Sequence, residues 1–152
     1  MAEIKNISIR SNPLDEIMID GDENRIIKLD LADIGVFSRF EKAIPEMDKI
    51  EQHFRELNEA SGDDLKQMQD FAKALTAAEK ELSTVIDGIF NSPVCDICAN
   101  GASLFSLDAG AFLYERIVEA VGSLYGDRLK GQVEERAKRR ERLAKHTAKY
   151  TK

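Results

Sequence analysis

The chain has 152 residues and a net charge of −6, and 43% of its residues are hydrophobic and 33% charged. This length suits one domain with a modest core, and three prolines and nine glycines are too few for a disordered linker protein. No apolar run approaches the roughly 18–20 residues that span a membrane, and the N-terminus lacks the apolar core of a signal peptide. We therefore expect a cytoplasmic protein that makes no membrane contact.

The N-terminal part of the chain predicts a small antiparallel β-sheet. Residues 16–20 and 25–31 have the composition of two strands, and the Gly and Asn of residues 21–24 suit a hairpin loop of about four residues. Residues 4–9 form an isoleucine-rich run with β propensity. Because a two-stranded hairpin is marginally stable alone, we expect this run to add a third strand, or a helix to pack on the hairpin, or both.

Residues 32–60 predict two helices separated at Pro45. Ile34, Phe37, Phe40 and Ile44 recur at the spacing that keeps one face of a helix apolar. Pro45 lacks the N–H donor and crowds the preceding turn, so we expect it to end or kink the first helix. The second helix then continues to Ala60.

The longest predicted helix covers residues 61–91. Ser61 is its expected N-cap, with Asp64 completing a capping box, and Pro93 stops it. The junction at residues 60–62 is short, which favours an antiparallel αα-hairpin with the preceding helix. Its expected buried stripe consists of Leu65, Met68, Ala72, Leu75, Leu82, Ile86 and Ile89.

The remainder predicts a short helical segment and then a last long helix. Residues 92–107 accommodate one or two helical turns around Gly101, and Ser106 or Asp108 is the expected cap of the following helix. The predicted class is mainly α (α+β), a β-hairpin or three-stranded sheet followed by a bundle of three to four helices. We expect one domain over residues 1–127, with the sheet in 1–31 and the bundle in 32–127. The apolar face of the last helix consists of Phe112, Leu113, Ile117, Val118, Val121, Leu124, Tyr125 and Leu129.

Residues 128–152 form a basic tail. They contain ten Lys or Arg against three Glu, a net charge of +7, so the rest of the chain carries −13. Such a tail can bind the acidic body of its own chain, a second copy, or an acidic partner. We expect a solvated helical extension that frays unless a partner holds it. Nucleic-acid binding is disfavoured, because the body is acidic and the tail has no interleaved aromatic residues.

No catalytic motif is present. The chain lacks the phosphate-binding glycine loops, the H-E-x-x-H zinc motif and the nucleophile elbow. Cys95 and Cys98 form a single C-x-x-C with no second pair, which favours buried or half-buried structural thiols over redox or metal chemistry. His53 is expected on the surface of a helix. We therefore expect no enzymatic activity, no cofactor and no metal site.

The order of these features resembles a known family. It combines an Asp-Gly turn at residues 19–22, an I-K-L-D-L strand at 27–31, an I-D-G-I-F helix end at 86–90, a Cys- and Gly-containing turn at 95–101, and an amphipathic helix with a basic tail. The chain is similar in this order to the tail assembly chaperones of long-tailed bacteriophages, particularly siphophages and related prophages of Gram-positive hosts. The resemblance covers nearly the whole chain.

The resemblance implies a function and a partner. Such chaperones bind the tape measure protein, a long apolar helical chain, in the cytoplasm of the bacterial host, and keep it soluble while the tail tube polymerises. They have no enzymatic activity or cofactor. Self-association into a homo-oligomer is a further expectation.

Exposed apolar and basic side chains are the expected contacts with such a partner. Alternative functions are a structural or connector protein of the phage tail, and a small helical regulator whose basic tail contacts nucleic acid. The candidate partner-binding residues are Phe37, Phe40, Phe54, Phe105, Phe112, Arg136, Arg139 and Arg140.

Overall fold

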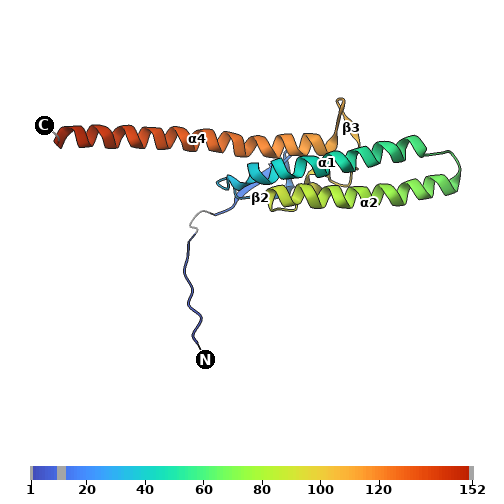
Figure 1. The fold of residues 1–152 in the computed structure, drawn as a ribbon, viewed down its shortest axis with the longest axis horizontal. Coiled ribbons are helices and arrows are strands. Elements are labelled where there is room, and N and C mark those ends of the chain that lie inside the picture. The colour runs from blue at the N-terminus through green and yellow to red at the C-terminus, as the bar shows by residue number, and fades with distance from the viewer. Residues whose placement is uncertain (1, 10–12, 151–152) are drawn as a thin grey trace.

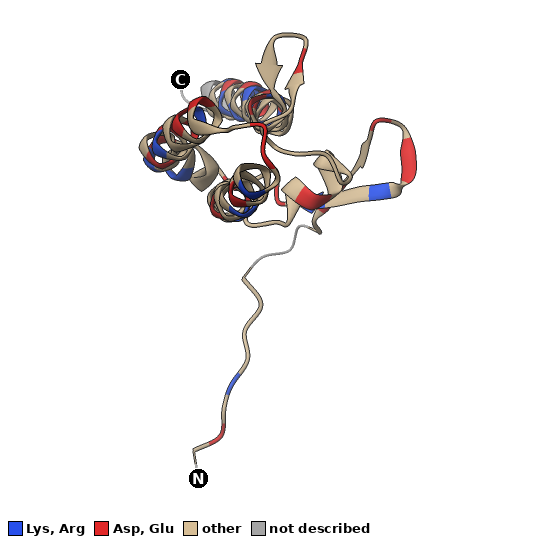
Figure 2. Cartoon of the chain, turned by 90° about the vertical axis from the view of Figure 1, so that its right-hand side faces the viewer, with Lys and Arg blue, Asp and Glu red and all other residues tan. Residues whose placement is uncertain are grey.

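The structure is a computed structural model that describes residues 2–9 and 13–150. It is mainly helical: an N-terminal antiparallel β-hairpin precedes four helices, of which the last is the longest (Figure 1). The helices α1, α2 and α4 lie alongside one another, and the hairpin lies at one side of this bundle (Figure 2). The predicted fold class is confirmed.

The hairpin consists of β1 (Asp15–Ile19) and β2 (Asp22–Leu29). Its turn has two residues, Asp20 and Gly21, with φ of 52° and 71°. Positive φ at both positions is what the tightest hairpin turns require, and Asp-Gly supplies it readily. The predicted hairpin is confirmed, but the predicted four-residue loop is wrong because the strands continue up to this turn.

The predicted third strand is absent: residues 2–9 contain no strand. The side chains of Ile4, Ile7 and Ile9 are 96%, 77% and 84% exposed. The hairpin packs against helices instead, which was the alternative expected from the sequence. Its inner residues are buried, and the Arg25 guanidinium donates hydrogen bonds to the carbonyl oxygens of residues 97 and 98 at 3.0 and 2.7 Å.

Helix α1 (Gly35–Ala60) runs without interruption through Pro45, so the predicted division into two helices is wrong. Pro45 is exposed, whereas Ala43, Met47 and Ile50 on either side of it are buried on one face. Packing of this face holds the helix together despite the roughly 3 kcal/mol that an interior proline costs.

Helix α2 (Leu65–Phe90) returns antiparallel to α1, as predicted. Its N-cap is Asp64, whose Oδ1 accepts a hydrogen bond from the Gln67 amide at 2.7 Å. Ser61 instead follows the end of α1, where its hydroxyl donates to the Asn58 carbonyl at 2.8 Å. The prediction that Ser61 caps α2 is therefore wrong, because Ser61 serves the preceding helix.

The apolar stripe of α2 is buried only in its C-terminal half. Leu82, Ile86 and Ile89 are at most 1% exposed, whereas Leu65 and Met68 are 71% and 56% exposed. The tip of the α1–α2 hairpin extends past the other helices and has no layer to cover it (Figure 1). Burial of the whole predicted stripe is therefore wrong for its first two turns.

Helix α3 (Val94–Ala99) ends at Asn100 and Gly101, both with positive φ, which confirms the predicted break at Gly101. The short strands β3 (Leu107–Asp108) and β4 (Ala111–Phe112) follow and were not predicted. They turn at residues 109 and 110, which also have positive φ. The last helix therefore begins after Phe112 and not at the predicted caps Ser106 or Asp108.

Helix α4 (Leu113–Tyr150) is about 57 Å long at 1.5 Å per residue. Its first half packs on the body through the buried residues Ile117, Val121 and Tyr125. Residues 133–147 are all exposed, and this half projects beyond the body (Figure 1). The predicted helical character of the tail is confirmed.

In the described ranges no helix has the length and apolarity to cross a membrane.

Candidate partner-binding site

An apolar groove of about 260 Å³ lies between α1 and α4, with the end of α2 as its floor. Apart from one glutamate and one glycine, its lining is hydrophobic. The lining residues are Val36, Phe37 and Phe40 of α1, Ile89 and Phe90 of α2, and Val118, Glu119 and Gly122 of α4.

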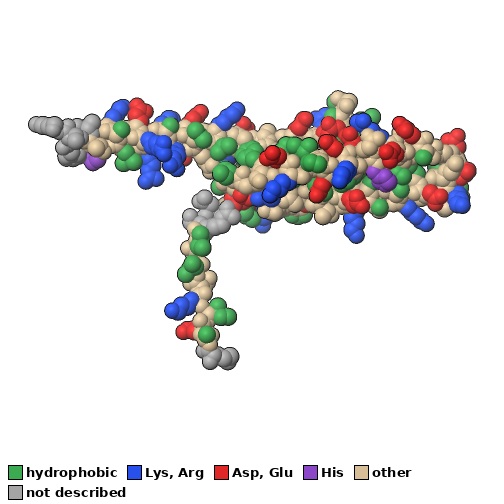
Figure 3. Space-filling view, viewed as in Figure 1, with side chains coloured by type: hydrophobic (Ala, Val, Ile, Leu, Met, Phe, Trp, Pro, Cys, Tyr) green, Lys and Arg blue, Asp and Glu red, His purple; other side chains and the backbone are tan. Residues whose placement is uncertain are grey.

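Helix α1 supplies the rim of this groove. Ile34, Phe37, Phe40 and Ile44 are 61%, 41%, 37% and 40% exposed. Their spacing of three and four residues places them on one side of the helix, next to its buried face. Large apolar side chains that cluster in this way on a surface indicate an interaction site more strongly than scattered ones. Figure 3 shows hydrophobic side chains gathered where α1 and α4 meet, with charged side chains around them.

The floor of the groove belongs to the core. Ile89 and Phe90 are 1% and 4% exposed, and Val36 is 3% exposed. The ring of Phe90 stacks on that of Tyr125, with centroids 5.9 Å apart. The groove thus has a rigid floor below a partly exposed aromatic rim.

Two contacts hold α4 against the bundle on either side of the groove. At one end the Tyr114 hydroxyl donates a hydrogen bond to Oε1 of Glu51 at 2.6 Å. Burial, followed by this bond to a carboxylate, raises the pKa of Tyr114 and keeps its hydroxyl protonated. At the other end Tyr125 stacks on Phe90. Val118 and Gly122 lie between these two anchors along α4.

The N-terminal end of α1 is fixed beside the groove by Arg39. Its Nε donates to the Ile89 carbonyl at 2.8 Å, and its Nη2 pairs with Oδ2 of Asp33 at 2.8 Å. Asp33 in turn accepts a hydrogen bond from the Gly35 amide at 2.9 Å. These bonds set the position of the first turns of α1, which carry Phe37 and Phe40.

Gly122 lies inside α4, as do Gly126 and Gly131, but of these three glycines it is the one that lines the groove. A glycine there is less favourable than an alanine by about 0.5–1 kcal/mol. A Cβ built on Gly122 would meet no heavy atom within 4 Å, so packing within the described chain does not require the small residue. Its effect is to leave space in the wall of the groove.

The other three candidate phenylalanines lie together elsewhere in the fold. Phe54 stacks on Phe105 with centroids 4.3 Å apart, and Phe112 meets both rings edge-on at 5.9 and 6.1 Å. Phe105 is only 5% exposed, and the other two are half-buried. The structure therefore brings Phe37 and Phe40 together at the groove and places this aromatic cluster in the interior.

The candidate arginines are separate from the groove. Arg136, Arg139 and Arg140 are exposed on the projecting half of α4 (Figure 1). One contact between the tail and the body is the ion pair of Arg128 with Asp15, at 3.0 Å. The basic tail thus does not fold back on the acidic body in this structure.

The two cysteines are buried and half-buried, as predicted. Burial, with the charge of Asp87 beside it, raises the pKa of Cys95, and burial also raises the pKa of Cys98. Both thiols therefore stay protonated near neutral pH, and this lowers their reactivity. Among the residues that the structure describes, no three His, Cys, Asp or Glu side chains form a metal-binding group. His53 is exposed.

Sequence reasoning did not single out Gly122, although a glycine inside a predicted amphipathic helix is a usable signal.

Comparisons with protein-family models, with curated proteins and with solved structures find no match for this chain.

Proposed function

We propose that this chain is a non-catalytic assembly chaperone that covers an amphipathic helix of another protein in the groove between α1 and α4. The observation that carries the proposal is the exposed aromatic rim of Phe37 and Phe40 above a buried apolar floor. The resemblance to tail assembly chaperones supplies the identity of the client, the tape measure protein of a phage tail.

The dimensions of the site suit a helix. The exposed strip on α1 runs from Ile34 to Ile44, about 15 Å at 1.5 Å per residue. A helical ligand with anchors at positions i, i+3 or i+4, and i+7 spans about 10 Å, so it fits within this length. The aromatic side chains at the rim adapt to clients whose apolar side chains vary along a long sequence.

The expected affinity is moderate. The groove accommodates two or three client side chains, each contributing about 1.5–3 kcal/mol before the costs of association. An interaction of this size is reversible. Reversibility is needed because the client has to leave the chaperone when the tail tube closes around it.

Co-expression with an apolar helical segment of the tape measure protein tests this proposal. The chain should form a complex with the segment and increase its soluble fraction. A variant that carries both Phe37→Asp and Phe40→Asp should lose this effect, because the charges oppose burial of the client.

The matched control places the same charges on exposed apolar residues outside the groove. Leu65→Asp with Met68→Asp, at the tip of the α1–α2 hairpin, should retain client binding. Absence of any complex with the unmodified chain, and of any gain in solubility, would refute the proposed function. Finished phage particles should also lack the chain; its presence there would identify a structural component.

A further inference from the structure

The outer edge of β1 has no further strand beside it in the described part of the chain. On the far side of β2, the Ser92 hydroxyl donates to the Lys28 carbonyl at 2.9 Å, and Arg25 bonds to two carbonyl groups of α3. β1 pairs with β2 alone, so in the described part of the chain its other edge has no strand beside it. Such an edge presents backbone N–H and C=O groups that can pair with a further strand.

A hollow lies beside β1. It has a volume of about 380 Å³ and lies between β1 and the first half of α4. Residues 17–20 of β1 and its turn line it, together with Ile27 of β2 and Cys98 of α3, so the hollow borders β1 and also extends along the inner face of the hairpin. The opposite wall is mostly apolar and includes Leu113, Ile117, Val121 and Leu124 of α4.

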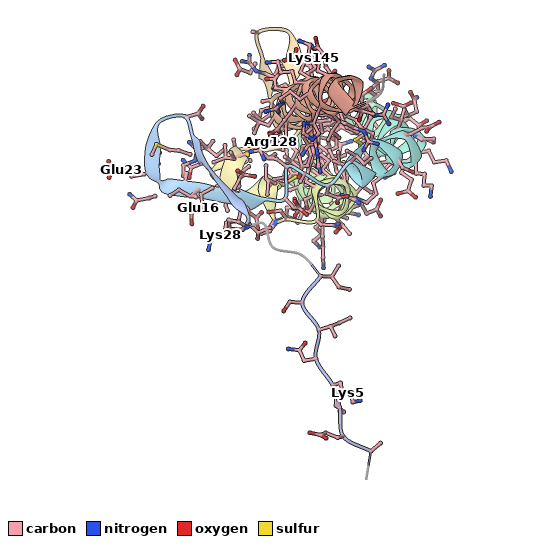
Figure 4. All side chains as sticks on the ribbon, turned by 90° about the vertical axis from the view of Figure 1, so that its left-hand side faces the viewer. Lys5, Glu16, Glu23, Lys28, Arg128 and Lys145 are labelled. Atoms are coloured by element: carbon pink, nitrogen blue, oxygen red, sulfur yellow. The ribbon has the colours of Figure 1, made fainter. Side chains whose placement is uncertain are left out.

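The chain contains a segment that fits this site. Residues 2–9 are extended and carry three isoleucines that are at least 77% exposed. Ile7 and Ile9 share one face of a strand with Lys5, since side chains alternate with a period of two. This N-terminal arm leaves the body away from the hairpin, and Lys5 lies well apart from Glu16 and Glu23 (Figure 4).

The charges of the two segments are complementary. Residues 15–23, which form β1, the turn and the first two residues of β2, contain five acidic residues and no Lys or Arg. Residues 2–10 contain Lys5 and Arg10 against Glu3, a net charge of +1. Figure 2 shows red acidic segments on the hairpin, and Figure 4 labels Lys5 on the arm.

We propose that the N-terminal arm of one copy adds as a third strand to the open β1 edge of a second copy. Reciprocal exchange of the two arms gives a closed dimer, because each chain offers one arm and one edge. Backbone hydrogen bonds supply the pairing, and Ile7 and Ile9 cover the apolar wall of the hollow. This inference does not depend on the proposed client or on the groove between α1 and α4.

Measurement of the mass of the full chain in solution, by light scattering after size-exclusion chromatography, tests the exchange. The full chain should have twice the mass of the 17.1 kDa monomer. Removal of residues 3–9, or Ile7→Asp with Ile9→Asp, should give a monomer with an unchanged far-ultraviolet circular dichroism spectrum. Ile4→Asp, on the opposite face of the strand, should leave the dimer intact.

A peptide of residues 2–10 provides the second measurement. It should bind the arm-deleted monomer, and its affinity for the full-length dimer should be at least about tenfold weaker, because the edge is already paired there. A monomeric full chain, or a dimer that survives removal of the arm, would overturn the proposal. A peptide that fails to bind the arm-deleted chain would do the same.

Discussion

Replacing Gly122 with leucine should weaken capture of the helical client by about one to two orders of magnitude and leave the fold at least as stable as before. A Cβ at this position meets no heavy atom within 4 Å, and Gly122 lines the groove, so we expect a leucine side chain to occupy groove space. Removing a glycine from the interior of α4 also raises helix stability by about 0.5–1 kcal/mol. The substitution is therefore expected to lower binding while it raises stability.

The expected loss follows from the space that the leucine fills. If it displaces one client side chain, binding loses about 1.5–3 kcal/mol, which corresponds to one to two orders of magnitude in the dissociation constant. Isothermal titration with a soluble tape measure peptide measures this change. Gly131→Leu, on the same helix but outside the groove, is the matched control and should bind normally. Unchanged binding by the Gly122→Leu variant would show that the client does not enter the groove.

Replacing Phe105 with alanine should lower the free energy of unfolding by about 3–5 kcal/mol. Phe105 is 5% exposed and contacts the rings of Phe54, Phe112 and Tyr114. Loss of its ring leaves a cavity that these neighbours cannot close. Because small domains are stable by only about 5–15 kcal/mol, this is a large fraction of the total, and urea unfolding followed by circular dichroism should show it.

Phe37→Ala is the comparison for this substitution. Phe37 is 41% exposed at the rim of the groove, and its removal should cost about 1 kcal/mol or less. The two variants therefore distinguish a packing phenylalanine from a binding one. An equal loss of stability in both would place Phe37 in the core and remove it from the proposed site.

Sequence periodicity predicts which face of an element is apolar, but it does not say what covers that face. The stripe of α2 shows this limit: Leu82 and Leu65 obey the same heptad rhythm, yet one is buried and the other is exposed at an uncovered tip. The same limit explains why the five candidate phenylalanines could not be separated in advance. Phe37 and Phe105 differ only in the elements that pack around them.

Local breaker rules were reliable where the backbone alone decides the structure. Gly101 after α3 has the positive φ that its residue type favours, and so has Gly21 at the hairpin turn, although the predicted loop of residues 21–24 is wrong. The rule was wrong at Pro45, where burial of Ala43 and Met47 on one face keeps α1 continuous. There the packing of α1 outweighs the tendency of proline to end a helix. Packing between elements cannot be read from the residues around Pro45 alone.

The strands β3 and β4 could not be predicted by propensity, because each has only two residues. Because these strands occupy residues 107–112, the last helix begins later than expected. Whether residues 4–9 form a third strand also depends on pairing, because a run with β propensity becomes a strand only beside a free sheet edge. The open edge of β1 became visible only in the structure.

Photo-crosslinking from the rim of the groove tests the central claim most directly. With benzoylphenylalanine in place of Phe37, irradiation of the complex should produce a covalent adduct with the tape measure segment. The same probe in place of Met68, which is 56% exposed at the tip of the α1–α2 hairpin, should produce none. An adduct from position 68 alone, or none from position 37 in a complex that demonstrably forms, would contradict the claim that the groove between α1 and α4 holds a helix of another protein.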